Sequence, residues 1–209
     1  MIAIVDYEAG NLTSVWRAFT ALGVPAVITG KGEEILAADR VVFPGQGHAG
    51  AGMASLSRLG LDEVLRTVFR RGIPLLGICL GAQIVLDHSE ESDTACLGLL
   101  AGKALRFPEN HSDAQGRRLK VPHMGWNDLK IRQVHPVLEG IPDWAQFYFV
   151  HSYYPEPEQE RHTVAQSSFG FAFASVLAYE NLVATQFHPE KSGRPGLRLL
   201  ANFASWSGK

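Results

Sequence analysis

Hydrophobic and polar residues follow two alternating patterns over the first 90 residues of the chain. Short, continuous apolar runs, which are typical of buried strands, predict strands at 2–5, 26–29, 40–43 and 74–78. Apolar residues spaced three or four positions apart, which are typical of amphipathic helices, predict helices over 12–22, 61–69 and 83–86. This alternation predicts β-α-β units and a parallel sheet that helices cover on both faces.

After about residue 95, turn residues and short β-type runs replace the helical spacing. Turn-forming residues cluster at 108–117, and runs at 146–150, 162–166, 171–178 and 181–187 predict antiparallel strands that extend the central sheet. Ser192 is a candidate N-cap for a last helix with an apolar stripe of Leu199, Leu200, Phe203 and Trp206. Because no repeat or long linker divides the sequence, we expect one α/β domain over 1–209 with a mostly parallel central sheet flanked by helices.

Composition and charge exclude several classes of protein. A chain of 209 residues with 46% hydrophobic residues can bury a substantial core, and its net charge of −2 offers no basic field for nucleic acid or an anionic membrane. Two cysteines cannot form a disulfide framework, which indicates a reducing compartment. The N-terminus lacks the basic start of a signal peptide, and no apolar run reaches 18 residues. We therefore expect a cytoplasmic protein.

A nucleophile pattern follows the predicted strand at 74–78. The sequence Gly77-Ile78-Cys79-Leu80-Gly81 places a cysteine between two glycines on a turn from strand to helix. Glycines lack the side chains that would collide with neighbouring backbone in such a tight turn. A helix N-terminus favours a thiolate, and we expect the amide of Leu80 to face a developing oxyanion. We interpret Cys79 as a catalytic nucleophile and Cys96, which has no such surroundings, as a core residue.

His188 and Glu190 follow the apolar run that ends at Phe187. Residues i and i+2 point to the same side of an extended chain, so Glu190 can reach the ring of His188 while Pro189 stiffens the turn. A thiolate nucleophile needs a base and a group that orients the base. The same combination of nucleophile, histidine and acid occurs in other hydrolases with a nucleophile elbow. The sequence thus predicts a Cys79–His188–Glu190 triad.

Taken together, these motifs resemble those of the class I, triad-type glutamine amidotransferases. The resemblance rests on the elbow with Gln83 and on the run Phe187-His188-Pro189-Glu190. Further stretches resemble the glutaminase subunits of imidazole glycerol phosphate synthases: VPHMGWN at 121–127, YFVHSYY at 148–154, DY at 6–7 with GNL at 10–12, and KSG at 191–193. The resemblance covers essentially the whole chain.

The resemblance implies hydrolysis of glutamine to glutamate and ammonia, which would pass through a channel to a (β/α)₈ cyclase partner in a heterodimer. In histidine biosynthesis, that partner would form imidazole glycerol phosphate and an aminoimidazole carboxamide ribonucleotide. The resemblance assigns the oxyanion hole to Gln46, Gly47 and Leu80. It also assigns glutamine binding to Gly45, Gln83, His151, Ser152 and Tyr153, and the partner interface to Asn11, His123, Trp126 and Lys191.

The sequence departs from the family pattern at two places, and other interpretations stay open. Gln46 stands where a small or apolar residue is usual, and Glu8-Ala9 replaces a glycine-rich pair. No metal-ligand spacing and no dinucleotide or ATP phosphate loop occurs, so we predict no cofactor and no metal. The alternatives are the glutaminase subunit of another amidotransferase, such as anthranilate synthase, a non-catalytic scaffold, or a cysteine peptidase of similar fold. Ala82 and the run 122–127 disfavour the first, and the intact triad together with the Gln83 match disfavours the others.

Overall fold

The structure is a computed structural model that describes residues 1–8 and 12–209. Its strands are β1 (Ile2–Val5), β2 (Ala26–Thr29), β3 (Arg40–Gly45), β4 (Leu75–Cys79), β5 (His88–Ser89), β6 (Thr94–Ala95), β7 (Gly102–Arg106), β8 (His123–Ile131), β9 (Ala145–His151), β10 (Tyr153–Pro157), β11 (Thr163–Phe169), β12 (Phe171–Tyr179) and β13 (Leu182–Thr185). Its α-helices are α1 (Leu12–Ala21), α2 (Gly32–Leu36), α3 (Ala49–Leu59), α4 (Leu61–Arg70), α5 (Leu80–Ile84) and α6 (Gly193–Ser205), and its 3-10 helices are η1 (Pro136–Leu138), η2 (Glu160–His162) and η3 (Pro189–Lys191).

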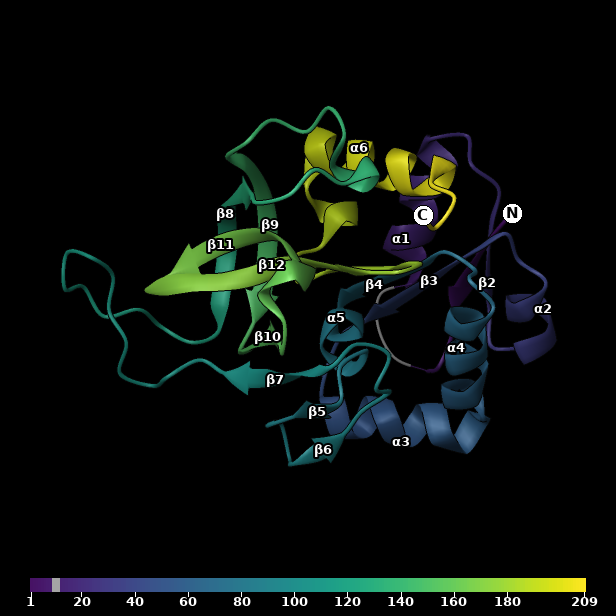
Figure 1. The fold of residues 1–209 in the computed structure, drawn as a ribbon, viewed down its shortest axis with the longest axis horizontal. Coiled ribbons are helices and arrows are strands. Elements are labelled where there is room, and N and C mark those ends of the chain that lie inside the picture. Colours follow the sequence, from purple (N-terminus) through teal and green to yellow (C-terminus); the bar gives the residue numbers. More distant parts are fainter. Residues whose placement is uncertain (9–11) are drawn as a thin grey trace.

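The main sheet has the strand order β2-β1-β3-β4-β13-β12-β11-β8-β9 (Figure 1). Strands β2, β1, β3, β4 and β13 pair in parallel. From β13 onward, β12, β11, β8 and β9 pair antiparallel. Both the parallel sheet predicted from the first 90 residues and its antiparallel extension are confirmed. A smaller sheet, with the order β10-β7-β5-β6, lies beside the main one.

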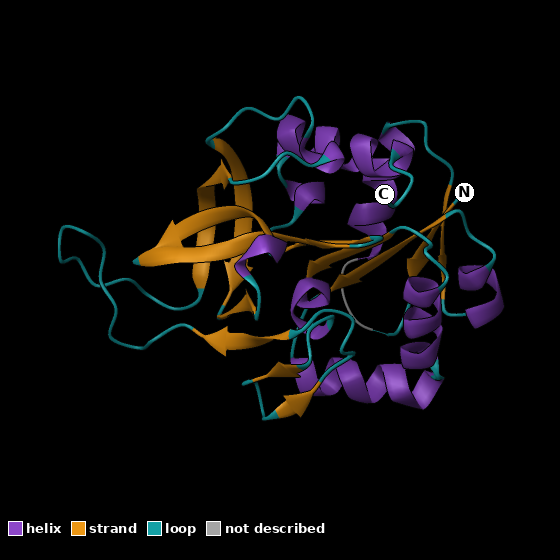
Figure 2. Ribbon diagram, viewed as in Figure 1, coloured by secondary structure: helices purple, strands orange, loops and turns teal. Residues whose placement is uncertain are grey.

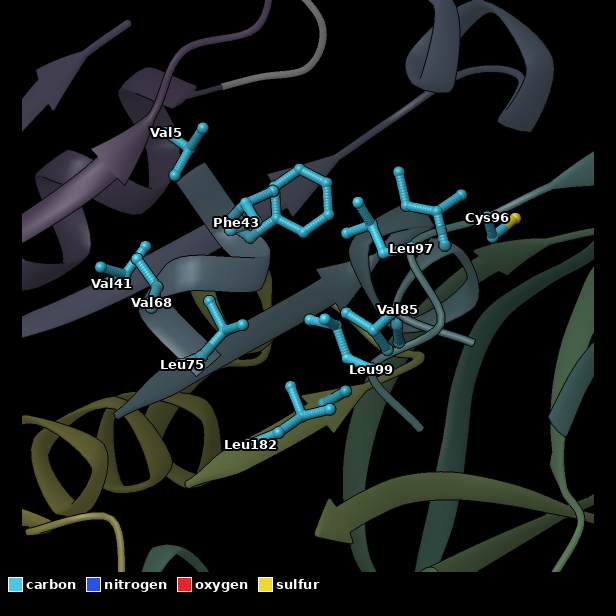
Figure 3. Close-up of a cluster of buried hydrophobic side chains, with 14 of the residues drawn as sticks. Val5, Val41, Phe43, Val68, Leu75, Val85, Cys96, Leu97, Leu99 and Leu182 are labelled. Atoms are coloured by element: carbon cyan, nitrogen blue, oxygen red, sulfur yellow. The ribbon is translucent and has the colours of Figure 1, made fainter. Parts of the chain in front are cut away.

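Helices cover the parallel half of the sheet on both faces (Figure 2). Successive residues of β1 alternate between two buried clusters: Ala3 and Val5 pack with α3 and α4, whereas Ile2 and Ile4 pack with α1 and α6. Figure 3 shows part of the first cluster, in which Val5, Phe43 and Leu182 come from three different strands. Because each such side chain is removed from water, its burial contributes roughly 1.5–3 kcal/mol to folding.

Several element boundaries differ from those predicted. Strand β3 continues through Pro44 to Gly45, which pairs with Cys79 of β4. Helix α5 begins directly at Leu80 and is short, so the elbow leads into helix without an intervening loop. Ser192 occupies the N-cap position of α6 but does not cap it, because its Oγ donates to the His188 carbonyl oxygen at 2.6 Å.

Helix α3 and the segments β7, β8 and β10 were not predicted as elements. Helix α3 is rich in small residues (AGAGMASLSRL), which give little contrast between an apolar and a polar face. Its first turn is fixed instead by side chains, since His48 accepts from the Gly50 amide and Glu91 accepts from the Ala49 amide. Among the helices that the structure describes, none has the length and apolar character needed to cross a bilayer.

Candidate active site

Cys79 sits on a sharp turn between β4 and α5. Its backbone has φ 55° and ψ −105°, a conformation that a residue with a side chain adopts only at a cost of roughly 1–3 kcal/mol. Close packing on both sides of the turn explains the two glycines. A Cβ at Gly77 would lie 3.0 Å from the Gly81 carbonyl oxygen, and a Cβ at Gly81 would overlap the carbonyl oxygen of Phe43. The predicted elbow is therefore present as a strained strand-to-helix turn.

The sulfur of Cys79 lies among polar groups from distant parts of the chain. Its thiol lies 3.9 Å from the Val150 carbonyl oxygen of β9, and the side-chain nitrogen of Gln186 lies 3.8 Å from the sulfur. Cys79 itself is buried, with 6% of its surface exposed. A nucleophile held at this depth is shielded from bulk water yet reaches the cavity described below.

His188 follows β13 and is held by contacts of both its ring and its backbone. Its Nδ1 lies 2.9 Å from Oε1 of Glu190, and each of the two side chains is only 2% exposed. Its backbone amide donates to the Tyr148 carbonyl oxygen at 2.9 Å. Within the described part of the chain, its Nε2 has no hydrogen-bond partner, so this nitrogen is available to a reacting group.

The electrostatic surroundings of His188 favour the protonated ring. Burial alone lowers the pKa of this side chain, but the interactions with Cys79 and with Glu190 outweigh burial and raise the pKa to about 9. A histidine in this state is an imidazolium ion at neutral pH. It can therefore deliver a proton to a departing group next to Cys79.

A cavity of about 480 Å³ opens over Cys79, which is within the size range of small-molecule sites. The residues that line it come from the loop after β3, from the elbow, from β9 and β10, and from the turn after β13. They are Gln46, Gly47, Cys79, Leu80, Gln83, Glu91, Pro122, Tyr148, Val150, His151, Ser152, Tyr153, His188 and Lys191.

Comparison with known proteins identifies the family. The family model described as "Glutamine amidotransferase class-I" matches residues 3–205. The chain belongs to the class-I glutamine amidotransferase family. It is 52% identical over 203 residues to the imidazole glycerol phosphate synthase subunit HisH of Nitratidesulfovibrio vulgaris, covering 97% of this chain and 95% of the relative. It is 47% identical over 209 residues to the subunit HisH of Aromatoleum aromaticum, covering 99% and 98%.

Solved structures share the fold of this glutamine amidotransferase. PurLQS from Thermotoga maritima matches with a TM-score of 0.75 at 17% identity, covering 98% of this chain and 97% of the other. A glutamine amidotransferase from Thermotoga maritima matches with a TM-score of 0.66 at 17% identity, covering 93% of this chain and 77% of the other. The predicted α/β fold of the family is thus confirmed.

Most residues predicted to bind glutamine in this amidotransferase line the cavity, but Gly45 does not. Gly45 is buried at the end of β3, where a Cβ would overlap the Tyr7 hydroxyl and approach Leu80 Cβ to 2.8 Å. The lack of a side chain lets β3 pack closely against the elbow, and the assignment of Gly45 to glutamine binding stays a prediction. Gln46, Gly47 and Leu80, which were predicted to form the oxyanion hole, do line the cavity.

Gln83 has a fixed orientation in the cavity wall. Its side-chain nitrogen donates to the Tyr153 carbonyl oxygen and to Oε1 of Gln186, each at 3.0 Å. Both N–H groups of this amide are therefore used by the protein, which leaves its oxygen as the acceptor for a ligand. Gln83 is 4% exposed, so the amide cannot exchange these partners for water.

His123 and His151 form a buried pair, and the assignment of His123 to the partner interface stays a prediction. The two residues are opposite each other on β8 and β9, with Nδ1 of His123 2.9 Å from Nε2 of His151. His123 is only 5% exposed, because its side chain is on the inner face of β8. The exposed side chains of β8 include Met124 and Trp126 instead, at 63% and 55% exposure.

The remaining predicted interface residues are differently placed. Trp126 is exposed and contacts Tyr148 edge-on, and Lys191 lies in η3 at the wall of the cavity. Asn11 lies outside the residues that the structure describes. Tyr148, whose ring Trp126 contacts, lines the cavity together with Lys191, so Trp126 lies next to a residue of the cavity wall.

Sequence reasoning missed several residues of the site. Glu91, Pro122, Tyr148 and Val150 line the cavity, and the side-chain nitrogen of Gln186 contacts the Cys79 sulfur. Gln186 had a detectable signal, because it is a polar residue inside the apolar run that leads to His188. A buried polar side chain in such a run needs a hydrogen-bond partner, and here the partners are Gln83 and Cys79.

Proposed function

We propose that this glutamine amidotransferase hydrolyses glutamine with Cys79 as nucleophile, His188 as proton donor and acceptor, and Glu190 as the residue that orients His188. The observation that carries the proposal is the geometry of His188. Its Nδ1 is held by Glu190 at 2.9 Å, while its Nε2 makes no hydrogen bond among the described residues, and His188 and Cys79 line the same cavity. This is the arrangement that a base serving a cysteine nucleophile requires.

The reaction would proceed in two stages. The Cys79 thiolate attacks the carbon of the glutamine side-chain amide, and the resulting tetrahedral intermediate carries a negative oxygen. His188 gives its proton to the departing nitrogen, so ammonia leaves and a thioester remains on Cys79. The neutral ring of His188 then takes a proton from water, which attacks the thioester, and glutamate leaves as the thiolate is restored.

Backbone amides would stabilise the negative oxygen. We assign this role to the N–H groups of Leu80 and of the loop at Gln46 and Gly47, all of which line the cavity. Gly47 has φ 106°, a conformation that glycine adopts without strain. The peptide between Gln46 and Gly47 is therefore free to reorient at low cost. Gln83, Ser152 and Tyr153 would hold the amino-acid end of glutamine.

We further propose that the ammonia passes to a (β/α)₈ cyclase partner in histidine biosynthesis. The relatives from N. vulgaris and A. aromaticum bear the name of an imidazole glycerol phosphate synthase subunit, which supports this assignment. Met124 and Trp126 give β8 exposed apolar side chains, and large aromatic side chains are enriched at interfaces.

The single family match over residues 3–205 supports our proposal of one domain over the whole chain. The two unpaired cysteines suit the reducing conditions of the cytoplasm, which we propose as the location of the protein.

The test compares glutamate release by the wild-type chain and by Cys79→Ala, each alone and with the cyclase subunit. We expect Cys79→Ala to lose glutaminase activity while still binding the cyclase, because the substitution removes only one sulfur atom from a side chain at the edge of the cavity. The cyclase in that complex should still react when supplied with ammonium salts at alkaline pH. Full glutaminase activity in Cys79→Ala would refute the proposed nucleophile.

A further inference from the structure

Gln186 places a buried amide against the sulfur of the proposed nucleophile. The residue lies between β13 and His188, and none of its surface is exposed. Its side-chain nitrogen is 3.8 Å from Cys79 Sγ, which is within hydrogen-bond distance for a sulfur acceptor. Its backbone amide donates to the Ser175 carbonyl oxygen at 2.9 Å, which fixes the main chain from which the side chain extends.

Gln83 determines which end of the Gln186 amide faces the sulfur. The Gln83 nitrogen donates to Oε1 of Gln186 at 3.0 Å, so the NH₂ group of Gln186 must point away from Gln83 and toward Cys79. If the Gln186 amide were reversed, two NH₂ groups would face each other and a carbonyl oxygen would face the sulfur. In a buried site, such an arrangement would leave donors without acceptors, which is costly.

The orientation of Gln83 is fixed in turn by the carbonyl oxygen of Tyr153. This oxygen accepts from Gln83 at 3.0 Å, and Nδ1 of His151 lies 2.7 Å from it. A carbonyl oxygen can only accept, so Nδ1 of His151 carries the proton. Burial lowers the pKa of His151 to about 3 and that of His123 to about 4, so both rings are neutral. Nε2 of His151 then accepts from Nδ1 of His123.

These hydrogen bonds form a chain that runs from His123 through His151, the Tyr153 carbonyl oxygen, Gln83 and Gln186 to the Cys79 sulfur. Each donor in this chain has one allowed direction. We propose that Gln186 is a further catalytic residue, which donates a hydrogen bond to the Cys79 thiolate and is oriented for this by Gln83. The proposal rests on the proposed role of Cys79 as nucleophile. A fixed donor favours the thiolate before attack on glutamine, and favours it again when Cys79 is the leaving group in thioester hydrolysis.

The test measures alkylation of Cys79 by iodoacetamide across pH, because only the thiolate reacts. The only other cysteine of the sequence, Cys96, should not react, because burial, with a contribution from Asp87, raises its pKa to about 12. Alkylation of the chain therefore reports on Cys79. Gln186→Met removes the donor and keeps a similar volume. We expect alkylation of Cys79 at pH 7 to slow by about ten-fold, and kcat for glutamine in the cyclase complex to fall by about the same factor.

Two further variants separate a role at the sulfur from a role in packing. Gln186→Glu keeps the oxygen that accepts from Gln83 but turns a carboxylate oxygen toward the sulfur, so we expect slower alkylation than in Gln186→Met. Ser175→Ala is the matched control. Ser175 is fully buried and neighbours Gln186 through its backbone, and its hydroxyl has no partner in the described part of the chain. Its alkylation profile should equal that of the wild type.

The outcomes distinguish this inference from the proposed function. If Gln186→Met and Gln186→Glu fold, bind the cyclase, and keep the wild-type alkylation profile and kcat, the role of Gln186 is refuted while the triad stands. If both variants show slower alkylation of Cys79 at neutral pH but the wild-type rate at alkaline pH, the role of Gln186 is supported, because a misfolded site would not regain the wild-type rate. If the wild-type complex hydrolyses no glutamine, the proposed function fails, whereas the alkylation result still reports on Gln186.

Discussion

Replacing Glu190 by glutamine tests the electrostatic coupling of the proposed triad. The substitution keeps the shape of the side chain and an oxygen that can accept from His188 Nδ1, but it removes the negative charge. Each of the paired side chains is 2% exposed, so solvent screens their interaction little. The change in charge should therefore act almost fully on His188.

The size of the effect follows from the protonation of His188. Its pKa is raised from 6.5 to about 9 despite burial, which corresponds to about 3 kcal/mol in favour of the imidazolium ion. Cys79 and Glu190 are the groups that raise it. A hydrogen bond to a charged group contributes roughly 1.5–3 kcal/mol, so Glu190→Gln should lower this pKa by about one to two pH units.

The assay is an NMR titration of the His188 ring in the wild type and in Glu190→Gln, with the signal assigned from its loss in His188→Asn. The lower pKa should reduce the fraction of imidazolium at pH 7.5, and glutaminase kcat in the cyclase complex should fall with it.

Because the folded pKa of His188 is raised, its contribution to stability is complete below pH 6.5 and is lost as pH rises through about 9. In Glu190→Gln this loss should occur at lower pH, as urea unfolding can measure. An unchanged titration midpoint would refute the coupling.

Three further predictions concern the elbow, the base and the oxyanion loop. Gly81→Ala introduces a Cβ that overlaps the Phe43 carbonyl oxygen, so thermal unfolding should show a loss of about 1–3 kcal/mol or more, together with loss of activity. A stable, active variant would contradict the packing at the elbow. His188→Ala should lower kcat by about 10²–10⁴-fold and should be more damaging than Glu190→Gln, and the reverse order would overturn the assigned roles. Gln46→Pro removes an N–H from the oxyanion loop, so glutaminase activity with the cyclase should fall about 10²–10³-fold while complex formation, measured by titration calorimetry, persists.

The parts of the site that depend on local spacing could be predicted from the sequence. The elbow requires glycines two residues on either side of Cys79, and the His188–Glu190 contact joins residues two apart. The contacts that orient Gln186 and Gln83 could not be predicted in this way. The Gln186–Cys79 contact spans 107 residues and the Gln83–Tyr153 contact 70 residues, so they depend on which strands become neighbours. Strand order is a property of the whole sheet and is not encoded in any one segment.

His123 marks a case in which the sequence held more information than the motif suggested. The resemblance assigned both His123 and Trp126 to the partner interface, since they lie in one run. Side chains of a strand alternate between its two faces, so residues three apart must point in opposite directions. Once the run is recognised as part of β8, exposure of Trp126 implies burial of His123, and the 55% and 5% exposed fractions agree with this. The buried face then requires a partner for the His123 ring, and the cross-strand register with β9 supplies it in His151.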